Sequence, residues 1–283
     1  MFENAKVINE GGGSFLKAEL KKMFLDKGVE FCAALDYSNC REINSGLIKK
    51  ESFEPKSAIV FLIPYFVDIP DNISIYASSL DYHIIIKELS SEIISGLKQI
   101  FEGYNFKVYG DHSPIDERHA ALISGLGIAG DHGLLINEKY GSYVFIADIV
   151  TDVPPDKLGA VSPHGIKCCE HCGACKSACP TGILSGNNSE CLSAITQRKG
   201  ELFDFEIDLM KRYNTVWGCD ICQRACPHNI NPRQTPIDSF YFDRINCLTL
   251  DLIEKMSDEE FSRRAFAWRK RKTIIRNLEY LDS

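Results

Sequence analysis

The sequence lacks the features that would carry a chain into or across a membrane. It has no apolar run of about 18 residues, which is roughly the length that a membrane-spanning helix needs. Its first residues, Met1 to Lys6, lack the basic-then-apolar order of a secretory signal peptide. We therefore expect a cytoplasmic chain that works in reducing surroundings and has no membrane partner.

The chain also lacks an excess of positive charge and any repeat of solenoid length. Its formal net charge is −7 at pH 7, which argues against a protein coated in basic surface for nucleic acid. One local basic stretch, residues 263–276, holds seven Lys and Arg residues and no acidic residue, together with Trp268. Such a stretch is typical of a solvated helix face, but it also permits phosphate contact or base stacking.

Cysteine, in contrast, is abundant: the chain has twelve in 283 residues. Without an export signal, and clustered as they are, these cysteines favour metal binding over disulfides. Residues 169–180 read Cys-x-x-Cys-x-x-Cys-x-x-x-Cys-Pro, and residues 219–227 read Cys-x-x-Cys-x-x-x-Cys-Pro. The first order is the bacterial pattern for two 4Fe–4S clusters, in which the last cysteine binds the other cluster. The sequence therefore predicts a chain that moves electrons one at a time.

The spacing also predicts which cysteines share a cluster. Three close cysteines can bind three irons, and a distant one must complete the fourth. The second run lacks a third close cysteine, and Cys191 fills that vacancy. The first cluster is predicted to use Cys169, Cys172, Cys175 and Cys226, and the second Cys179, Cys191, Cys219 and Cys222. Two zinc sites of four cysteines each are the alternative, although zinc sites rarely use a Cys-x-x-x-Cys-Pro ending. The remaining cysteines are predicted to be spectators: Cys32, Cys40, Cys168 and Cys247.

Residues 1–155 alternate between helical and strand patterns. Apolar spacing predicts helices over residues 15–26, 82–101 and 114–124, the last opening with a proline, and strands over 29–35, 58–63, 106–109 and 143–150. This alternation favours a mixed or parallel sheet covered by helices. We expect an α/β (α+β) domain with a mixed sheet over residues 1–155, a two-cluster ferredoxin-like domain over 156–230 and a short helical tail over 231–283. Pro154, Pro155 and the Gly and Pro residues up to Gly165 predict a linker.

Several segments outside the cysteines resemble the epoxyqueuosine reductase family, whose cobalamin-dependent iron–sulfur enzymes complete queuosine in tRNA. The resemblance runs from about residue 57 to about residue 281. The glycine-rich turn of residues 125–130, followed by Leu134-Leu135-Ile136, resembles a family segment. The other matching segments are Asp81-Tyr82-His83, Asp111-His112-Ser113-Pro114 with Glu117-Arg118, Gly141-Ser142, Thr151-Asp152 and Arg276-Asn277.

The resemblance implies that residues 1–155 form a cobalamin-binding and catalytic domain of the kind also seen in reductive dehalogenases. It implies that electrons pass from an external donor, such as ferredoxin or flavodoxin, through the two clusters to cobalt. It further implies that Asp111 protonates the oxygen that leaves the epoxide, since ring opening produces an alkoxide. From local sequence alone, Asp111 reads as an N-cap or turn residue. The implied cofactor-binding residues are Asp81, Tyr82, His83, Ser113, Pro114, Gly130, His132 and Gly133.

The chain departs from the family pattern in three places. Asp131 stands where the family has lysine, which reverses a charge beside the expected cofactor site, and His112 replaces a small residue. The sequence ends at Ser283, whereas longer members continue into helical repeats that help to hold tRNA. We expect a monomeric reductase that converts epoxyqueuosine to queuosine in tRNA. The alternatives are a paralogous corrinoid iron–sulfur reductase with another substrate and a ferredoxin-type electron-transfer protein.

Overall fold

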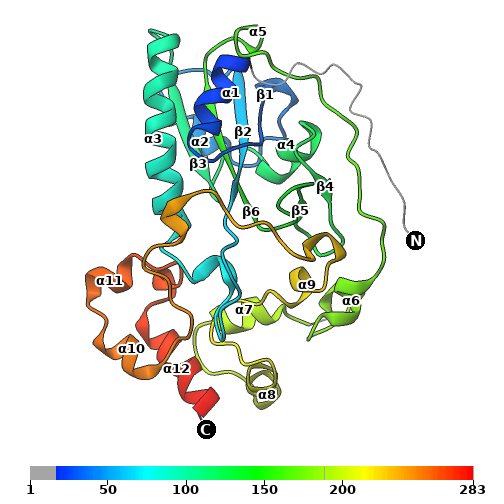
Figure 1. Cartoon of the computed structure of the whole chain (residues 1–283), viewed down its shortest axis with the longest axis vertical. Coiled ribbons are helices and arrows are strands. Elements are labelled where there is room, and N and C mark those ends of the chain that lie inside the picture. The colour runs from blue at the N-terminus through cyan, green and yellow to red at the C-terminus, as the bar shows by residue number, and fades with distance from the viewer. Residues whose placement is uncertain (1–16, 188, 283) are drawn as a thin grey trace.

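An α/β domain forms the upper part of the molecule, and a layer of short helices lies beneath it (Figure 1). The computed structural model describes residues 17–187 and 189–282. The main sheet has the strand order β1-β2-β6-β3, and a second sheet pairs β4 with β5. The strands are β1 (Cys32–Asp36), β2 (Ser57–Pro64), β3 (Phe106–Gly110), β4 (Ile128–Ala129), β5 (Leu135–Ile136) and β6 (Val144–Thr151).

The strand β2 forms the centre of the domain core. Its side chains alternate between the two faces of the sheet, as expected for an extended chain. Ile59 and Phe61 pack in a cluster with the helices α1 (Ala18–Leu25) and α3 (Tyr82–Ile100) on one face. Val60 and Leu62 pack with α4 (Glu117–Ile123) on the other. Burial on both faces explains why the sequence of this strand is a continuous apolar run. The bounds of β2 confirm the strand predicted over residues 58–63, and those of α3 confirm the helix predicted over 82–101. The first two residues of the helix predicted over 15–26 lie outside the described residues.

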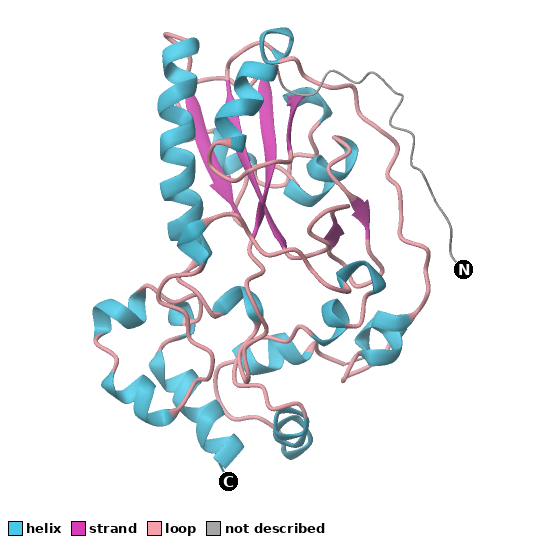
Figure 2. Ribbon diagram, in the orientation of Figure 1, coloured by secondary structure: helices cyan, strands magenta, loops and turns pink. Residues whose placement is uncertain are grey.

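The expectation of a mixed or parallel sheet is wrong. Each of the three strand pairs in the main sheet is antiparallel. The inference from alternation was sound for β2, α3 and β3, because the two strands flanking the helix do run in the same direction. However, β6 returns from later in the chain and inserts between them, antiparallel to both (Figure 2). The unit is thus a split βαβ arrangement, which local periodicity cannot distinguish from a parallel pair.

The helix predicted over residues 114–124 begins three residues later than expected. Asp116 caps α4, and its side chain accepts a hydrogen bond from the His119 backbone at 2.9 Å. Pro114 lies in a bend before the helix, where its carbonyl oxygen accepts hydrogen bonds from the backbones of Ile43 and Asn44. An aspartate cap satisfies free backbone N–H groups at a helix start, and here it outweighs the preference of proline for the first turn.

The lower layer joins the cluster region to the C-terminal helices. Trp217 is fully buried there and packs against Phe266 with ring centroids 6.2 Å apart. Ile73 and Ala77 reach down from the α/β domain into this core. The remaining helices are α2 (Ser45–Ile48), α5 (Pro155–Leu158), α6 (Ala174–Ala178), α7 (Leu192–Gln197), α8 (Asp204–Arg212), α9 (Ile221–Arg224), α10 (Leu250–Lys255), α11 (Asp258–Ser262) and α12 (Arg271–Asp282). Short 3-10 helices occupy Tyr37–Asn39, Ile75–Ala77, Ile183–Ser185, Pro227–Asn229, Asp238–Phe240 and Ala267–Arg269.

Part of the basic stretch 263–276 holds this layer together. The guanidinium groups of Arg264, Arg271 and Arg276 donate hydrogen bonds to the backbone carbonyls of Asp243, Ile253 and Arg198 respectively. Arg263, Lys270 and Lys272 are exposed, as is Trp268. The stretch is therefore only partly the solvated face that its composition suggests.

The first residues of the linker predicted at Pro154 are helical and pack against the α/β domain. Residues 155–158 form α5, and Leu158 is fully buried. Its carbonyl oxygen accepts a hydrogen bond from the backbone of Lys17 at 3.2 Å. Among the helices of the described residues, none is both long enough and apolar enough to cross a membrane.

Candidate active site and cluster-binding region

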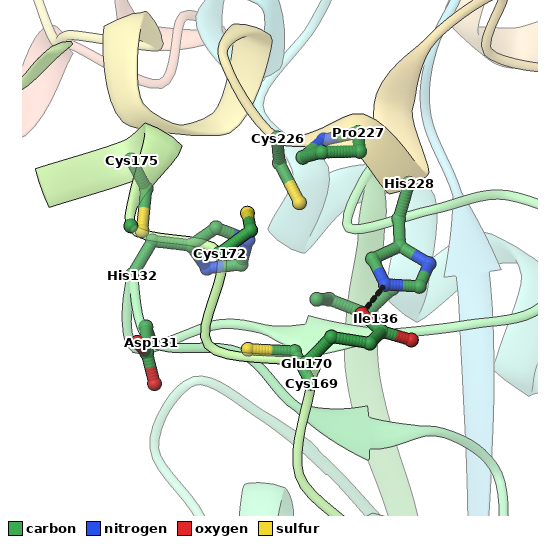
Figure 3. A pocket seen from close by; sticks show the side chains of 11 residues that line it. Asp131, His132, Ile136, Cys169, Glu170, Cys172, Cys175, Cys226, Pro227 and His228 are labelled. Atoms are coloured by element: carbon green, nitrogen blue, oxygen red, sulfur yellow. Dashed lines mark hydrogen bonds and ion pairs between the residues drawn. The ribbon is translucent and has the colours of Figure 1, made fainter. Parts of the chain in front are cut away.

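Four cysteines from three segments meet in one cavity beneath β5 (Figure 3). Cys169 and Cys172 lie in the loop before α6, Cys175 lies on α6, and Cys226 follows α9. Burial raises the pKa of the Cys226 thiol, and the neighbouring Cys175, Cys172 and Cys169 raise it further. This mutual influence requires the four sulfurs to be close together, which is the arrangement that the spacing predicts for the first cluster.

The other four predicted ligands form a second group. Burial raises the pKa of Cys219 to about 12 and that of Cys222 to about 11, and Cys191 adds to both effects. Cys179 also raises the pKa of Cys222, as does Cys175 of the first group. The two groups therefore lie near each other. A thiol with a raised pKa is protonated at neutral pH, so metal binding here must release protons.

The four cysteines expected to be spectators lie outside both groups. Cys32 is buried in the core of the α/β domain, and burial raises its pKa to about 12. Cys40 is partly buried and donates weakly to the Asp36 carbonyl, with 3.8 Å between sulfur and oxygen. Cys247 donates to Asp71. Cys168 is exposed although it neighbours Cys169. An exposed thiol beside the cavity provides a natural control for experiments on the ligands.

A larger cavity of about 470 Å³ opens between the sheet and the second cysteine group. This volume is within the usual range for small-molecule sites. The Tyr82 and Phe145 rings stack in its wall, with centroids 4.3 Å apart and planes 16° apart. Cys219 also reaches the wall. Flat aromatic surfaces of this kind suit a planar macrocycle. The full lining is Tyr65, Ser74, Tyr76, Tyr82, Asp111, Arg118, Gly133, Leu134, Leu135, Ser142, Val144, Phe145, Ile146, Cys219, Asp220 and Gln223.

Only some of the predicted cofactor-binding residues line this cavity. Tyr82 and Gly133 do, as does Asp111. The Asp81 side chain caps α3 and lies 2.7 Å from Nδ1 of His83, which stacks on Tyr82. Gly130 and His132 lie at the first cysteine group instead, where His132 lines the cavity. Ser113 and Pro114 are buried behind Asp111.

Asp131 also lies at the first cysteine group and not at the larger cavity. Its carboxylate is 2.7 Å from Nδ1 of His171 and 3.0 Å from Nζ of Lys176. Both partners belong to the cysteine-rich segment. The hydrogen bond from Lys176, followed by that from His171, lowers the pKa of Asp131. The residue that reverses the charge of the family pattern therefore lies at the first cysteine group, and it does not line the larger cavity.

Asp111 presents its carboxylate to the larger cavity from a left-handed backbone conformation. Its φ is 65°, a region that Asp tolerates better than most residues. The side chain is 67% exposed, and its Oδ2 accepts a hydrogen bond from the Tyr82 hydroxyl at 3.0 Å. Nε2 of His83 lies 3.8 Å from the same oxygen. The Asp111 backbone N–H donates to Oε1 of Glu117 at 3.2 Å. The carboxylate is thus oriented by Tyr82, and its backbone is held by Glu117.

One buried acid and one partly buried acid, Asp148 and Glu117, support the loop that carries Asp111. Asp148, on β6, is fully buried, and its Oδ1 accepts a hydrogen bond from the Ser113 hydroxyl at 2.6 Å. Its Oδ2 has no hydrogen-bond partner within the part of the chain that the structure describes. Burial raises the pKa of Asp148 to about 7. Burial, followed by the charges of Asp148 and Asp111, raises the pKa of Glu117 to about 8. Both acids therefore hold their protons to a higher pH than an ordinary carboxylic acid does.

These raised pKa values predict that stability depends on pH. In the unfolded chain, Asp148 and Glu117 lose their protons near their ordinary pKa values of 3.8 and 4.5. In the folded chain, both residues keep their protons to a higher pH. Their stabilising contribution is therefore present at low pH and is lost as the pH rises towards about 7 to 8. We expect Asp148→Asn to remove its share of this dependence, since the amide stays neutral and keeps an oxygen for Ser113.

Thermal unfolding of the full chain and of this variant, measured between about pH 5 and about pH 8, tests the prediction. The two proteins should have similar Tm values at the acidic end, and the variant should become relatively more stable towards the alkaline end. A difference in Tm that stays constant across this range would contradict the assignment of a neutral Asp148.

Sequence reasoning missed Asp148, Asp220 and Gln223. Asp148 gave the clearest signal, because it is an acid within an apolar strand, and buried acids are rare unless they have a role. Asp220 lies between two predicted ligands, and its carboxylate accepts hydrogen bonds from the Ser74 hydroxyl and the Ile75 backbone. These bonds tie the second cysteine group to the α/β domain across a sequence separation that no local pattern reveals.

Comparison with known proteins places these features in a family. Residues 168–229 match the model of a 4Fe-4S double cluster binding domain. An epoxyqueuosine reductase of Cyclobacterium marinum is 31% identical over 216 residues, which cover 74% of this chain and 68% of the relative. One of Lactococcus garvieae is 30% identical over 210 residues, which cover 71% of this chain and 58% of the relative. The match thus spans between about three fifths and two thirds of these relatives.

The fold agrees with a solved structure of the same class. A crystal structure of epoxyqueuosine reductase with an epoxyqueuosine-modified tRNA-Tyr stem loop aligns with a TM-score of 0.72 at 22% sequence identity. The alignment covers 93% of this chain and 80% of that one. It confirms the expected succession of an α/β domain and a double-cluster region.

Proposed function

The chain belongs to the epoxyqueuosine reductase family of iron–sulfur oxidoreductases, and from that membership we propose that it reduces the epoxide of epoxyqueuosine in tRNA to the alkene of queuosine. The reaction removes one oxygen atom as water and consumes two electrons and two protons. The observation that carries the proposal is that Asp111 and Cys219 line one cavity. The Asp111 carboxyl group, which can donate a proton, and Cys219, which is a predicted cluster ligand, therefore face the same cavity.

The donor sets fit the cofactors that the family implies. Each group of four thiols can hold one 4Fe–4S cluster, with the division into ligands predicted from the spacing. The aromatic wall of Tyr82 and Phe145 can hold a cobalamin. When bound, the clusters supply single electrons, and the cobalamin supplies a reducing metal centre for the epoxide carbon. We also propose residues 1–155, 156–230 and 231–283 as the cobalamin-binding domain, the cluster domain and the helical tail.

Asp111 and the side chains around it deliver one of the two protons that the reaction consumes. Tyr82 donates to Oδ2 of Asp111 and so orients the carboxyl group towards the cavity. A protonated Asp111 gives its proton to the oxygen that leaves the carbon, because an alkoxide is too basic to leave unprotonated. Glu117 holds the Asp111 backbone in its left-handed conformation meanwhile. Arg118 places a cation in the cavity wall, where it can accept an anionic group of the substrate or cofactor.

The proposed macromolecular substrate is tRNA, which the solved relative holds as a stem loop. In this chain, Trp268 is 55% exposed, and the Arg269 guanidinium lies 3.9 Å from its ring centroid. Exposed Arg263, Lys270 and Lys272 surround this pair in sequence. Stacking and phosphate contact are the interactions that such groups offer to RNA. An external carrier such as ferredoxin or flavodoxin is the proposed electron donor.

A turnover assay on a defined RNA tests the function. The full chain, reconstituted anaerobically with iron, sulfide and cobalamin, should convert an epoxyqueuosine-containing anticodon stem-loop to the queuosine form, seen as the loss of one oxygen atom by mass spectrometry. Omission of cobalamin is the control. Saturable corrinoid binding without turnover would favour a paralogue with another substrate. Absence of corrinoid binding under reducing conditions would favour the electron-carrier alternative.

A further inference from the structure

His132 lies in the wall of the cavity formed by the first four cysteines (Figure 3). The residue is only 8% exposed. Its position depends on Gly130, because a Cβ atom at that residue would lie 2.6 Å from Cε1 and 2.9 Å from Nδ1 of the ring. Real contacts are not this short, so any side chain at position 130 would displace the imidazole. The absence of a side chain at Gly130 therefore allows the His132 ring to lie against the cavity of the first four cysteines.

The hydrogen bonds of His132 fix the location of its proton. Nδ1 accepts a hydrogen bond from the Leu134 backbone N–H at 3.1 Å, so Nδ1 carries no proton. A neutral ring must then carry its proton on Nε2. Burial, followed by the charge of Arg118, lowers the pKa of His132, which agrees with a neutral ring.

The resulting Nε2–H group is buried and has no partner among residues 17–187 and 189–282. A buried donor without an acceptor costs about 1–3 kcal/mol, so such groups usually have a partner that belongs to the functional state. Neither carboxylate in the same cavity accepts a hydrogen bond from this group, although Oδ2 of Asp131 also has no hydrogen-bond partner among the described residues. Asp131 pairs with His171 and Lys176, and Glu170 lies 2.8 Å from Nε2 of His228. Besides these polar groups, the cavity contains the four sulfurs of the proposed ligands.

We propose that His132 donates an Nε2–H hydrogen bond to a sulfur atom of the first cluster, either a cysteine Sγ or an inorganic sulfide, and thereby raises the reduction potential of that cluster. The proposal rests on the ligand set given under Proposed function. The reduced cluster carries one more negative charge than the oxidised one, and this charge is spread over its sulfurs. A fixed donor therefore stabilises the reduced form more than the oxidised form.

Three substitutions separate this role from a merely structural one. His132→Leu removes both ring nitrogens at similar volume. His132→Asn keeps an acceptor near the position of Nδ1, for Leu134, but loses the donor at the Nε2 position. His132→Gln can place an amide N–H near the position of Nε2. The readout is the midpoint potential of each cluster, measured in the reconstituted full chain by redox titration monitored by electron paramagnetic resonance. A variant with the first cluster removed, such as Cys226→Ala, assigns the signal of the second.

We expect the Leu and Asn variants to give the first cluster a more negative midpoint potential. The one-electron reduction equilibrium should change on the order of tenfold, which corresponds to about 59 mV. Gln should restore part of the shift, and the second cluster should not change in any variant. The proposal would be overturned if the Asn variant, at full iron and sulfide content, kept the midpoint potential of the first cluster unchanged. This test holds even if the Leu variant fails to fold. Stoichiometric zinc without sulfide would overturn it as well. Because potentials are measured without RNA, failure to reduce epoxyqueuosine would count against the proposed function alone.

Discussion

Replacement of Cys226 by Ala is expected to remove the first cluster, preserve the second and abolish turnover. Cys226 is the one predicted ligand of its group that follows α9, and it is 6% exposed. Among the described residues, the other thiols that line its cavity are those of Cys169, Cys172 and Cys175, each already assigned to one iron. No described cysteine is therefore in place to bind the fourth iron. Iron and sulfide should fall to about half of the roughly eight atoms of each that two such clusters hold.

Cys168→Ala is the matched control for this experiment. Cys168 is adjacent to a predicted ligand, but it is exposed and does not line the cavity. Its replacement should leave the iron and sulfide content and turnover unchanged. Metal and sulfide analysis of both variants after anaerobic reconstitution gives the comparison. Full cluster content in Cys226→Ala, or loss of a cluster in Cys168→Ala, would show that the ligands are divided differently.

The residues that could be predicted from sequence are those whose structure depends on near neighbours. The helix α3 and the strand β2 agree with their expected limits to within one residue, because amphipathic spacing and continuous burial leave a local record. The cysteine pattern is equally local, since three thiolates within residues 169–175 can converge on a common centre. The expected succession of an α/β domain and a cluster region was correct for the same reason.

What could not be predicted depends on contacts between distant segments. Nothing near β2 or β3 shows that β6 inserts between them, and this insertion makes the sheet antiparallel. Similarly, the family resemblance implied that His132 and Gly133 both bind the cofactor. The structure separates them: Gly133 lines the larger cavity, whereas Asp131 and His132 line the first cysteine group. His132 and Gly133 are consecutive in the chain, so a family resemblance at the level of a segment could not assign them to different cavities.

The structure excludes one of the interpretations that the local sequence of Asp111 allows. Asp111 is not an N-cap, because α4 begins at Glu117 and its cap is Asp116. Asp111 instead occupies a left-handed position and directs its carboxylate to the cavity. Asn accepts this backbone conformation about as readily as Asp, so a change to Asn should not disturb the loop.

Asp111→Asn is therefore expected to keep both clusters, the corrinoid and the stability of the chain while it lowers turnover by roughly 10²–10⁴-fold, the usual contribution of a positioned acid. The amide oxygen can still accept the hydrogen bond from Tyr82, but the amide cannot release a proton to the departing oxygen. Asp116→Asn is the matched control, because it changes a nearby acid in the same way and Asn is an equally good cap. Its turnover should stay close to that of the unsubstituted protein. Single-turnover reduction of the epoxyqueuosine stem-loop gives the rates, and a near-normal rate for Asp111→Asn would remove this carboxyl group from the mechanism.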